Sequence, residues 1–525
     1  MVDRIFWNAT FITQDPRLPS VDAIAVHEGR IAAAGSLDSV NALAGPSTER
    51  VDLGGRTVTP GFNDAHVHVW KVGHLLTGML DLRGAKSLAD IEAAVRERAA
   101  SAPPGAWILG RGYNEAWMAE GRGPTRLDLD PVAPNHPVYL TRTCGHIAVA
   151  NTRALEIAGL SANTSAPAGG VIVRTESGEA TGELHETAMG LVGGKVPELS
   201  DAEYEAAVIA GARHQLALGI TSATEAGVSP ALLDVYRAME ARGALPYRVN
   251  VMALRRPLGG PETLPLPAPF QSDFLRVDTI KILADGGLSG ATAALRTPYR
   301  DSCSCGVLRV NNEELVELAK DAHMAGIRVG VHAIGDAAID AVLDAFEALA
   351  RMAPGPRHRL EHFGLPHEAQ LARAAALGAV AVPQAIFVRA LGRNFRRYLP
   401  DDLLARAYPI RDMLSSGMIT ALSSDAPVVA DDNPLLGIQA AILRTDDEGV
   451  AIAPDQAISI DEALFAYTMG GALASGDEAN RGSLTPGKWA DMAVLSGDPR
   501  SVPPEDLSQI RVDQTILGGQ TVFER

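Results

Sequence analysis

Short apolar runs alternate with helix-forming stretches through most of the chain. Two of the stretches, residues 312–325 and 337–350, are rich in good helix formers and predict helices. Eight of the apolar runs predict strands, and eight is the number of strands in a (β/α)8 barrel. These runs cover residues 58–62, 220–224, 248–252, 279–283, 328–331, 359–361, 380–382 and 418–422.

The two ends of the chain show another pattern, in which short strands are separated by tight turns. Gly29 lies in the turn of a predicted hairpin near the start, and Gly518-Gly519 lies in one near the end. Neither end can bury a core alone, so we expect both to form one small β-sandwich domain beside a distorted TIM barrel. The expected boundaries are residues 1–58 and 483–525 for the sandwich and 59–482 for the barrel.

The stretch from about residue 76 to residue 200 does not follow the strand–helix alternation. It is rich in glycine and proline, and it begins shortly after the first predicted barrel strand. We interpret it as a large insertion at the mouth of the barrel, where it could cover a site.

Composition narrows the class of protein. Of the 525 residues, 46% are hydrophobic and 21% are charged, as in soluble globular proteins. The net charge of −17 argues against binding to nucleic acid or to an anionic membrane. No targeting segment or membrane span is evident, and three cysteines are too few for a disulfide framework. We therefore expect a cytoplasmic protein whose partner is a small molecule.

The strongest chemical signal is the pair His66 and His68 at the end of a predicted strand. Alternate residues of a strand point the same way, so these two imidazoles project together. A TIM barrel carries its catalytic groups at the carboxyl ends of its strands, and two close imidazoles make half of a zinc site. Two polar residues at a strand end are the ordinary alternative, and this motif alone is weak.

Further ligand-type residues recur at other predicted strand ends. His332, His362 and Asp425 each follow an apolar run, and Lys281 lies on the run at residues 279–283. One such histidine is usually a core residue with a hydrogen-bonding neighbour. Their recurrence around one barrel predicts a site for a divalent metal, with zinc as first choice. Zinc makes hydroxide available at neutral pH, and Asp425 can accept a proton during attack and pass it to a leaving nitrogen.

The sequence resembles the amidohydrolase superfamily, within it the YtcJ-like amidohydrolase-3 branch that includes N-substituted formamide deformylases. The resemblance covers essentially the whole chain. Its motifs are residues 60–68, 144–151, 281–287, 332–336, 359–362, 424–427 and 482–491.

The resemblance implies a role for each matching residue. His66 and His68 would hold the more buried metal, and His332 and His362 would hold a second metal or serve a single-metal site. Lys281 corresponds to a lysine that many members carboxylate, giving a carbamate that bridges two metals. A buried lysine paired with Asp285 or with another carboxylate is the alternative. Asp425 would bind metal and act as the general base, and related barrels make a homodimer the default.

Five further residues are candidates for contact with the substrate. Cys144, His146 and Glu186 come from the insertion, and Arg296 could bind a substrate carboxylate, although a surface salt bridge is about as probable for it. Trp117 is the fifth. Asp336 and Glu361 flank predicted ligands and could orient imidazoles.

The resemblance implies hydrolysis of a non-peptide carbon–nitrogen bond, with a linear amide, an N-substituted formamide or an N-acyl compound as first choice. Deamination of a cyclic amidine or purine-like ring is the main rival on the same barrel. Deaminases carry a glutamate near the fifth-strand histidine, whereas Ala333, Ile334, Gly335 and Asp336 follow His332. A non-catalytic binding module is the third possibility, but such proteins lose ligands and this chain retains them.

Overall fold

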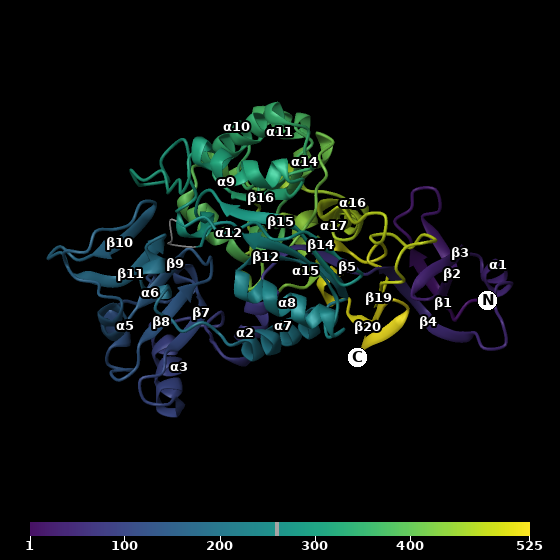
Figure 1. Ribbon diagram of the computed structural model, residues 1–525, viewed down its shortest axis with the longest axis horizontal. Coiled ribbons are helices and arrows are strands. Elements are labelled where there is room, and N and C mark those ends of the chain that lie inside the picture. The colour runs from purple at the N-terminus through teal and green to yellow at the C-terminus, as the bar shows by residue number, and fades with distance from the viewer. Residues whose placement is uncertain (258–261) are drawn as a thin grey trace.

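A nearly closed barrel of parallel strands lies at the centre of the molecule (Figure 1). The computed structural model describes residues 1–257 and 262–525. The order of the strands around the barrel is β18-β17-β16-β15-β13-β12-β5, and the short β14 (Phe270–Gln271) pairs with β15. The barrel strands are β5 (Phe62–Val67), β12 (Ile220–Val228), β13 (Arg248–Leu254), β15 (Leu275–Leu283), β16 (Arg328–Ala333), β17 (Arg359–His362) and β18 (Val380–Val382).

Residues 418–425 close the barrel between β18 and β5 without forming a regular strand. On one side, the amide of Ala421 donates to the carbonyl of Ala381 at 2.9 Å. On the other side, the amide of Ala65 donates to Leu422 at 3.4 Å, and that of Asp425 to His66 at 2.8 Å. The strand predicted at residues 418–422 therefore occupies the eighth position, reduced to an isolated bridge.

The prediction that residues 58–62 form the first barrel strand was wrong. Residues up to Pro60 belong to β4 (Glu49–Pro60) of a separate sheet, and the first barrel strand begins at Phe62. Between them, Gly61 lies against Thr221, where any Cβ would overlap the threonine side chain. Hydrophobicity alone does not show this boundary, because both strands are buried where they meet.

Helices that follow the strands cover the outside of the barrel. α10, for example, buries Ile339, Val342, Leu343 and Phe346, which recur at helical spacing and pack in one cluster with barrel residues such as Val331. The helices predicted at residues 312–325 and 337–350 correspond to α9 and α10. The helices are α2 (Val69–Thr77), α7 (Asp201–Leu216), α8 (Pro230–Ala241), α9 (Asn312–Met324), α10 (Asp336–Met352), α11 (Glu368–Ala376), α12 (Ile386–Tyr398), α13 (Asp401–Leu404), α14 (Ile410–Ser415), α15 (Pro434–Leu443), α16 (Ile460–Ala466) and α17 (Met469–Ser475).

The two ends of the chain meet in one seven-stranded sheet, in which β4 from the start pairs with β19 from the end (Figure 1). Successive residues of β1 face opposite sides of the sheet, so Ile5 and Phe6 enter two different apolar clusters. The order is β21-β20-β19-β4-β1-β2-β3. The bounds of the remaining strands and of the helix beside them are β1 (Arg4–Ile12), β2 (Ser20–His27), β3 (Arg30–Gly35), α1 (Leu37–Asn41), β19 (Met492–Leu495), β20 (Val512–Leu517) and β21 (Gln520–Glu524).

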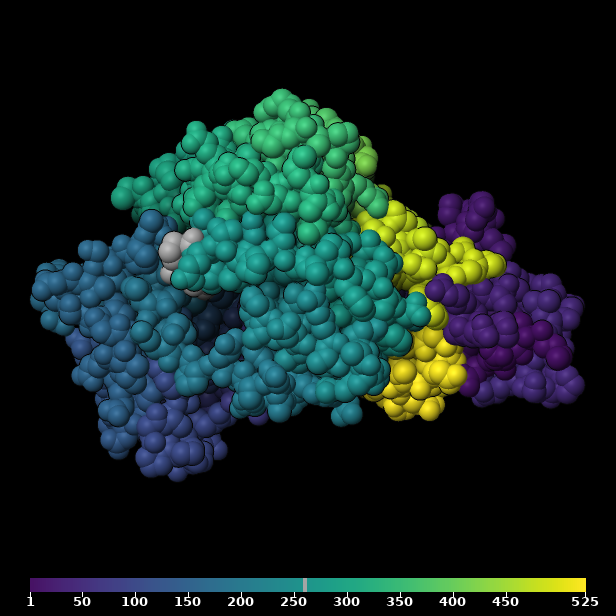
Figure 2. All heavy atoms as spheres, viewed as in Figure 1, coloured from purple at the N-terminus to yellow at the C-terminus, as the bar shows by residue number. Residues whose placement is uncertain are grey.

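The insertion at residues 76–200 contains a six-stranded sheet of its own, with the order β10-β11-β9-β8-β7-β6. Figure 2 shows a recess between the insertion and the barrel. The fold class predicted from the sequence is thus confirmed. The elements of the insertion are β6 (Leu80–Asp81), α3 (Leu88–Ser101), β7 (Ile108–Tyr113), α4 (Arg126–Leu129), β8 (Val138–Arg142), β9 (Ile147–Ala150), α5 (Thr152–Ile157), β10 (Gly170–Arg174), β11 (Ala180–Glu186) and α6 (Met189–Gly193).

No helix in residues 1–257 or 262–525 is long and apolar enough to cross a membrane.

Candidate metal centre

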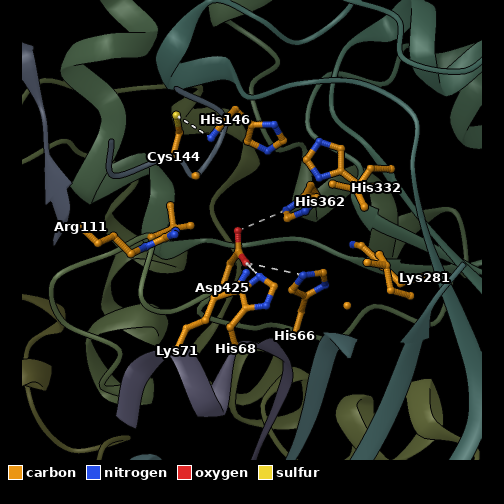
Figure 3. Close-up of a pocket in the computed structure, with 15 residues that line it drawn as sticks. His66, His68, Lys71, Arg111, Cys144, His146, Lys281, His332, His362 and Asp425 are labelled. Carbon is orange, nitrogen blue, oxygen red and sulfur yellow. Dashed lines mark hydrogen bonds and ion pairs between the residues drawn. The ribbon is translucent and has the colours of Figure 1, made fainter. Parts of the chain in front are cut away.

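His66 and His68 lie together at the carboxyl end of β5, in a cavity of about 150 Å³ between the barrel and the insertion (Figure 3). Nε2 of His68 lies 3.3 Å from Oδ1 of Asp425, and Nε2 of His66 lies 3.6 Å from the same oxygen. One ligand atom from each of these three residues lies within 4.8 Å of the others. Two imidazole nitrogens and a carboxylate oxygen are a donor set that fits zinc or a similar ion.

Hydrogen bonds place the protons of these two imidazoles on the side away from Asp425. Nδ1 of His66 lies 2.5 Å from the carboxylate of Glu361, and Nδ1 of His68 lies 2.8 Å from the carbonyl oxygen of Ala226. Both partners accept, so each Nδ1 carries the proton and each Nε2 keeps a lone pair. Such contacts orient metal-binding histidines and fix their tautomer.

His332 and His362 join the same cluster from β16 and β17, with their ring centroids 4.4 Å apart. Nδ1 of His362 donates to Oε1 of Gln384 at 2.7 Å, which leaves Nε2 with a lone pair. Nε2 of His332 donates to the carbonyl oxygen of Gly286 at 3.1 Å, so Nδ1 is its free ring nitrogen. The four predicted histidines are therefore side by side, each with one nitrogen unprotonated.

Burial keeps these imidazoles neutral. It lowers the pKa of His68 to about 3, with Lys71 adding to the effect, and lowers the pKa of His332 and His362 well below the usual range. Burial would raise the pKa of Asp425, but the close contact with His68 and with the other neighbouring histidines holds it well below its ordinary value. Neutral imidazoles beside an ionised carboxylate are the protonation states that bind a divalent cation.

Two of the predicted ligands sit on backbone that non-glycine residues rarely adopt. The φ angle is 70° at His362 and 54° at Asp425, and it is 51° at Glu186 across the cavity. Strained backbone of this kind persists only where the surroundings hold it, and it gathers at functional sites. These three positions therefore support a function at this end of the barrel.

Lys281 lies on β15 with its side chain buried, and its Nζ has no hydrogen-bond partner among the described residues. Burial lowers its pKa to about 8. The carboxylate of Asp285 does not pair with it and accepts the amides of Ala294, Ile334 and Gly335. The carboxylates of Glu361 and Asp425 are near enough to raise the pKa of Lys281 but form no ion pair with its Nζ among the described residues. A buried amine without a partner is compatible with the carbamate that the sequence predicts.

The insertion brings Cys144 and His146 to the opposite side of the cavity. Nδ1 of His146 lies 2.9 Å from the buried carboxylate of Glu186, and its ring lies 5.0 Å from that of His332. Glu186 also lies 3.5 Å from Nη1 of Arg309. The structure therefore links the three insertion residues that the sequence singled out, with Glu186 behind His146.

Besides Glu186, which lies behind His146, two candidate substrate residues do not line the cavity. The guanidinium of Arg296 pairs with Asp340, and its side chain is 46% exposed, which agrees with a surface salt bridge. Trp117 lies in the 3-10 helix Glu115–Trp117, with Lys86 near its ring. Within residues 1–257 and 262–525, neither residue lines the cavity that holds the histidine cluster.

Sequence reasoning missed two cations that line the cavity, Lys71 and Arg111. Lys71 follows His68 by three residues, a helical spacing that could have placed both on one face. Arg111 lies on β7 of the insertion, and no local pattern connects it with the barrel. Glu225 was also missed. It accepts the amide of Trp70 at 3.1 Å and the hydroxyl of Tyr236, and so holds the start of α2.

Fold and site together define a barrel hydrolase with a histidine-rich centre. Residues 49–523 match the model of the amidohydrolase family, and the chain belongs to that family. Members are metal-dependent hydrolases, and this chain is a hydrolase that acts on carbon–nitrogen bonds.

Relatives match the chain from end to end. The Bacillus subtilis protein YtcJ is 32% identical over 99% of this chain and 100% of its own. The N-substituted formamide deformylase of Arthrobacter pascens is 31% identical over 100% of this chain and 99% of its own. The crystal structure of a metal-dependent hydrolase from Pyrococcus horikoshii superposes with a TM-score of 0.76 at 28% identity, covering 96% of this chain and 99% of that one.

Proposed function

We propose that this enzyme hydrolyses the carbon–nitrogen bond of a small linear amide, such as an N-substituted formamide or another N-acyl compound. The convergence of His66, His68 and Asp425 on one point is the observation that carries the proposal. The full-length likeness to an N-substituted formamide deformylase supports the choice of a linear amide.

We propose that His66, His68 and Asp425 hold a divalent metal, with zinc as first choice, and that His332, His362 and a carboxylated Lys281 are available for a second ion. When bound, the metal supplies Lewis acidity for the amide carbonyl and makes water nucleophilic near neutral pH. Asp425 takes the proton of the attacking water and passes it to the nitrogen as the carbon–nitrogen bond breaks. The products are a carboxylic acid and an amine.

The neutral state of the histidines suits this assignment of the base. With the free nitrogens of His66 and His68 bound to the metal, the second carboxylate oxygen of Asp425 is the group of the cluster left to receive a proton. His146, held by Glu186 across the cavity, is placed to contact the substrate carbonyl or leaving group. Cys144 lines the same side and would limit the size of the substrate.

The test begins with protein purified without added metal, whose metal content is measured by inductively coupled plasma mass spectrometry. The chelator-treated protein is then reloaded with zinc or manganese and assayed on formamides and N-acyl amines, with acid and amine products quantified. We expect bound metal, loss of activity after chelation and recovery on reloading. Release of ammonia from cyclic amidines in place of acid and amine would favour deamination. Absence of metal even after reloading would overturn the proposal.

A further inference from the structure

Two cations face the metal centre and make no ion pair with any carboxylate of the described residues. They are Arg111, from β7 of the insertion, and Lys71, from the first turn of α2. In Figure 3, Arg111 and Lys281 lie on opposite sides of Asp425. Of the described residues that line the cavity, Asp425 alone carries a carboxylate, and it belongs to the predicted metal ligands.

The guanidinium of Arg111 is buried and poorly satisfied. The residue is 7% exposed, its Nε has no hydrogen-bond partner among the described residues, and Nη2 reaches the carbonyl oxygen of Thr143 only at 3.4 Å. Two other buried arginines of this protein show what pairing looks like: Arg248 contacts both oxygens of Asp491 at 2.6 and 2.9 Å, and Arg359 contacts Glu361 at 2.6 Å. Arg444 is also buried without a carboxylate, but it donates to the carbonyl oxygens of Ala453 and Ala407. An arginine buried without an anion is costly, so its counter-ion is expected from outside the chain.

The surroundings hold Arg111 in place. Gly145, with a φ of 77°, lets the turn before β9 lie against the guanidinium, where a Cβ would come within 3.1 Å of Nη2. A planar guanidinium fixed in this way presents a fork of donors that suits a carboxylate.

Lys71 is placed with similar rigidity. α2 packs on α7 at Gly73 and Gly211, where a Cβ on either would overlap the backbone of the other helix. Glu225 binds the first turn of α2 from behind. The Lys71 ammonium makes no hydrogen bond or ion pair with the described residues, and its Nζ lies 5.8 Å from the centroid of the Trp70 ring.

We propose that Arg111 and Lys71 form a carboxylate subsite and that the substrate is an amide that carries a carboxylate, of the N-acyl amino acid class. The inference rests on the proposed hydrolysis of a linear amide. One end of the substrate, the amide, lies at the histidine cluster, and its carboxylate lies between Arg111 and Lys71. A protein with a net charge of −17 has no general affinity for anions. The two cations therefore provide a local attraction that the rest of the chain lacks.

Matched substrate pairs test the subsite. N-formyl derivatives of alanine, leucine and phenylalanine are each compared with the formamide of the corresponding decarboxylated amine, on the metal-loaded enzyme. We expect kcat/KM to favour the carboxylate member by about 100-fold or more, as charge-assisted hydrogen bonds allow. Arg111→Met and Lys71→Met should each lower kcat/KM for that member by at least about tenfold. Their effect on the neutral member should be small.

Controls separate the subsite from general damage. Arg96→Met and Lys86→Met remove exposed cations from the same insertion and should leave both kinetic constants unchanged. Metal content is measured in every variant, so that metal loss is not mistaken for loss of the subsite. If Arg111→Met and Lys71→Met lower kcat/KM equally for both members of a pair while metal is retained, Arg111 and Lys71 take part in the reaction itself. That result would overturn the substrate class.

A binding measurement decides the case in which neither member is hydrolysed, which would count against the proposed function. Calorimetry with 4-methylpentanoate and with its neutral amide measures the affinity of the subsite for each compound without turnover. We expect the carboxylate to bind at least about tenfold more tightly than the amide, and Arg111→Met/Lys71→Met to abolish that difference. Carboxylate binding that the double variant leaves unchanged would mean that the anion binds elsewhere, and would overturn the subsite.

Discussion

The two walls of the cavity differ in how their polar groups are satisfied. On the barrel wall, His66 and His68 are each held by an acceptor that fixes the proton. On the facing wall, Arg111 of the insertion has no anionic partner among the described residues, and neither has Lys71, which lies at the edge of the barrel in α2 beside His68. The hydrogen bonds of the barrel wall are thus formed before any ligand binds, whereas the facing wall has positive charges that an anionic ligand would neutralise. This difference separates the groups of the chemistry from those proposed to recognise the substrate.

The largest effect is expected on the barrel wall, from Asp425→Ala. Loss of both a metal ligand and the proposed base should lower kcat by at least about 10³-fold. Metal content should fall as well, as measured by mass spectrometry on the purified variant. Asp461→Ala, at an exposed position of α16, is the control and should behave as the wild type. An Asp425→Ala enzyme with activity within tenfold of the wild type would contradict the proposed role.

Lys281 is the exception on the barrel wall, because its Nζ has no partner there among the described residues. If it is carboxylated, Lys281→Ala should lower the metal content from about two ions per chain to one or none and reduce kcat/KM by about 100-fold or more. Adding a short carboxylic acid should restore part of both. One ion per chain in wild type and variant alike would show that Lys281 is not a ligand.

A smaller effect, on metal affinity, should follow from weakening the hydrogen bond that orients His66. Glu361→Gln keeps the shape of the side chain but weakens its contact with His66, so we expect about 10- to 100-fold weaker metal affinity. The measurement is a competition with a chelator of known affinity. Arg359 also contacts Glu361, so thermal unfolding of the metal-free variant serves to detect any general loss of stability. Unchanged metal affinity would mean that His66 needs no such support.

The smallest expected effect concerns the pH dependence of stability and comes from His358, which lies in the barrel away from the cavity. Nδ1 of His358 accepts the amide of Val329, and its Nε2 lies 2.9 Å from Nδ1 of His323. Burial lowers the pKa of His358 to about 3, with His323 adding to the effect. Because the unfolded chain takes up the proton at higher pH, stability should fall as pH drops below about 6.5. The loss is about 1 kcal/mol by pH 5.5. His358→Gln should flatten this dependence of the melting temperature, and the exposed His27→Gln should not.

Much of the fold followed from local patterns in the chain. Six of the eight predicted barrel strands lie within observed strands of the barrel, such as residues 220–224 within β12. The error at residues 58–62 arose because a strand of the terminal sheet runs into the first barrel strand across Gly61. Nothing in an apolar run shows that its two halves pair with different sheets, since pairing is decided by segments distant in sequence.

The site divides in the same way. The two-residue period of a strand brings His66 and His68 to one side, and parallel strands present His332 and His362 at the same edge, so the sequence alone determined the histidine cluster. Only the tertiary structure decided that Arg111 reaches the cavity and Arg296 does not. Both arginines look alike in sequence, but packing of the insertion sheet against the barrel buries one, while Asp340 holds the other at the surface.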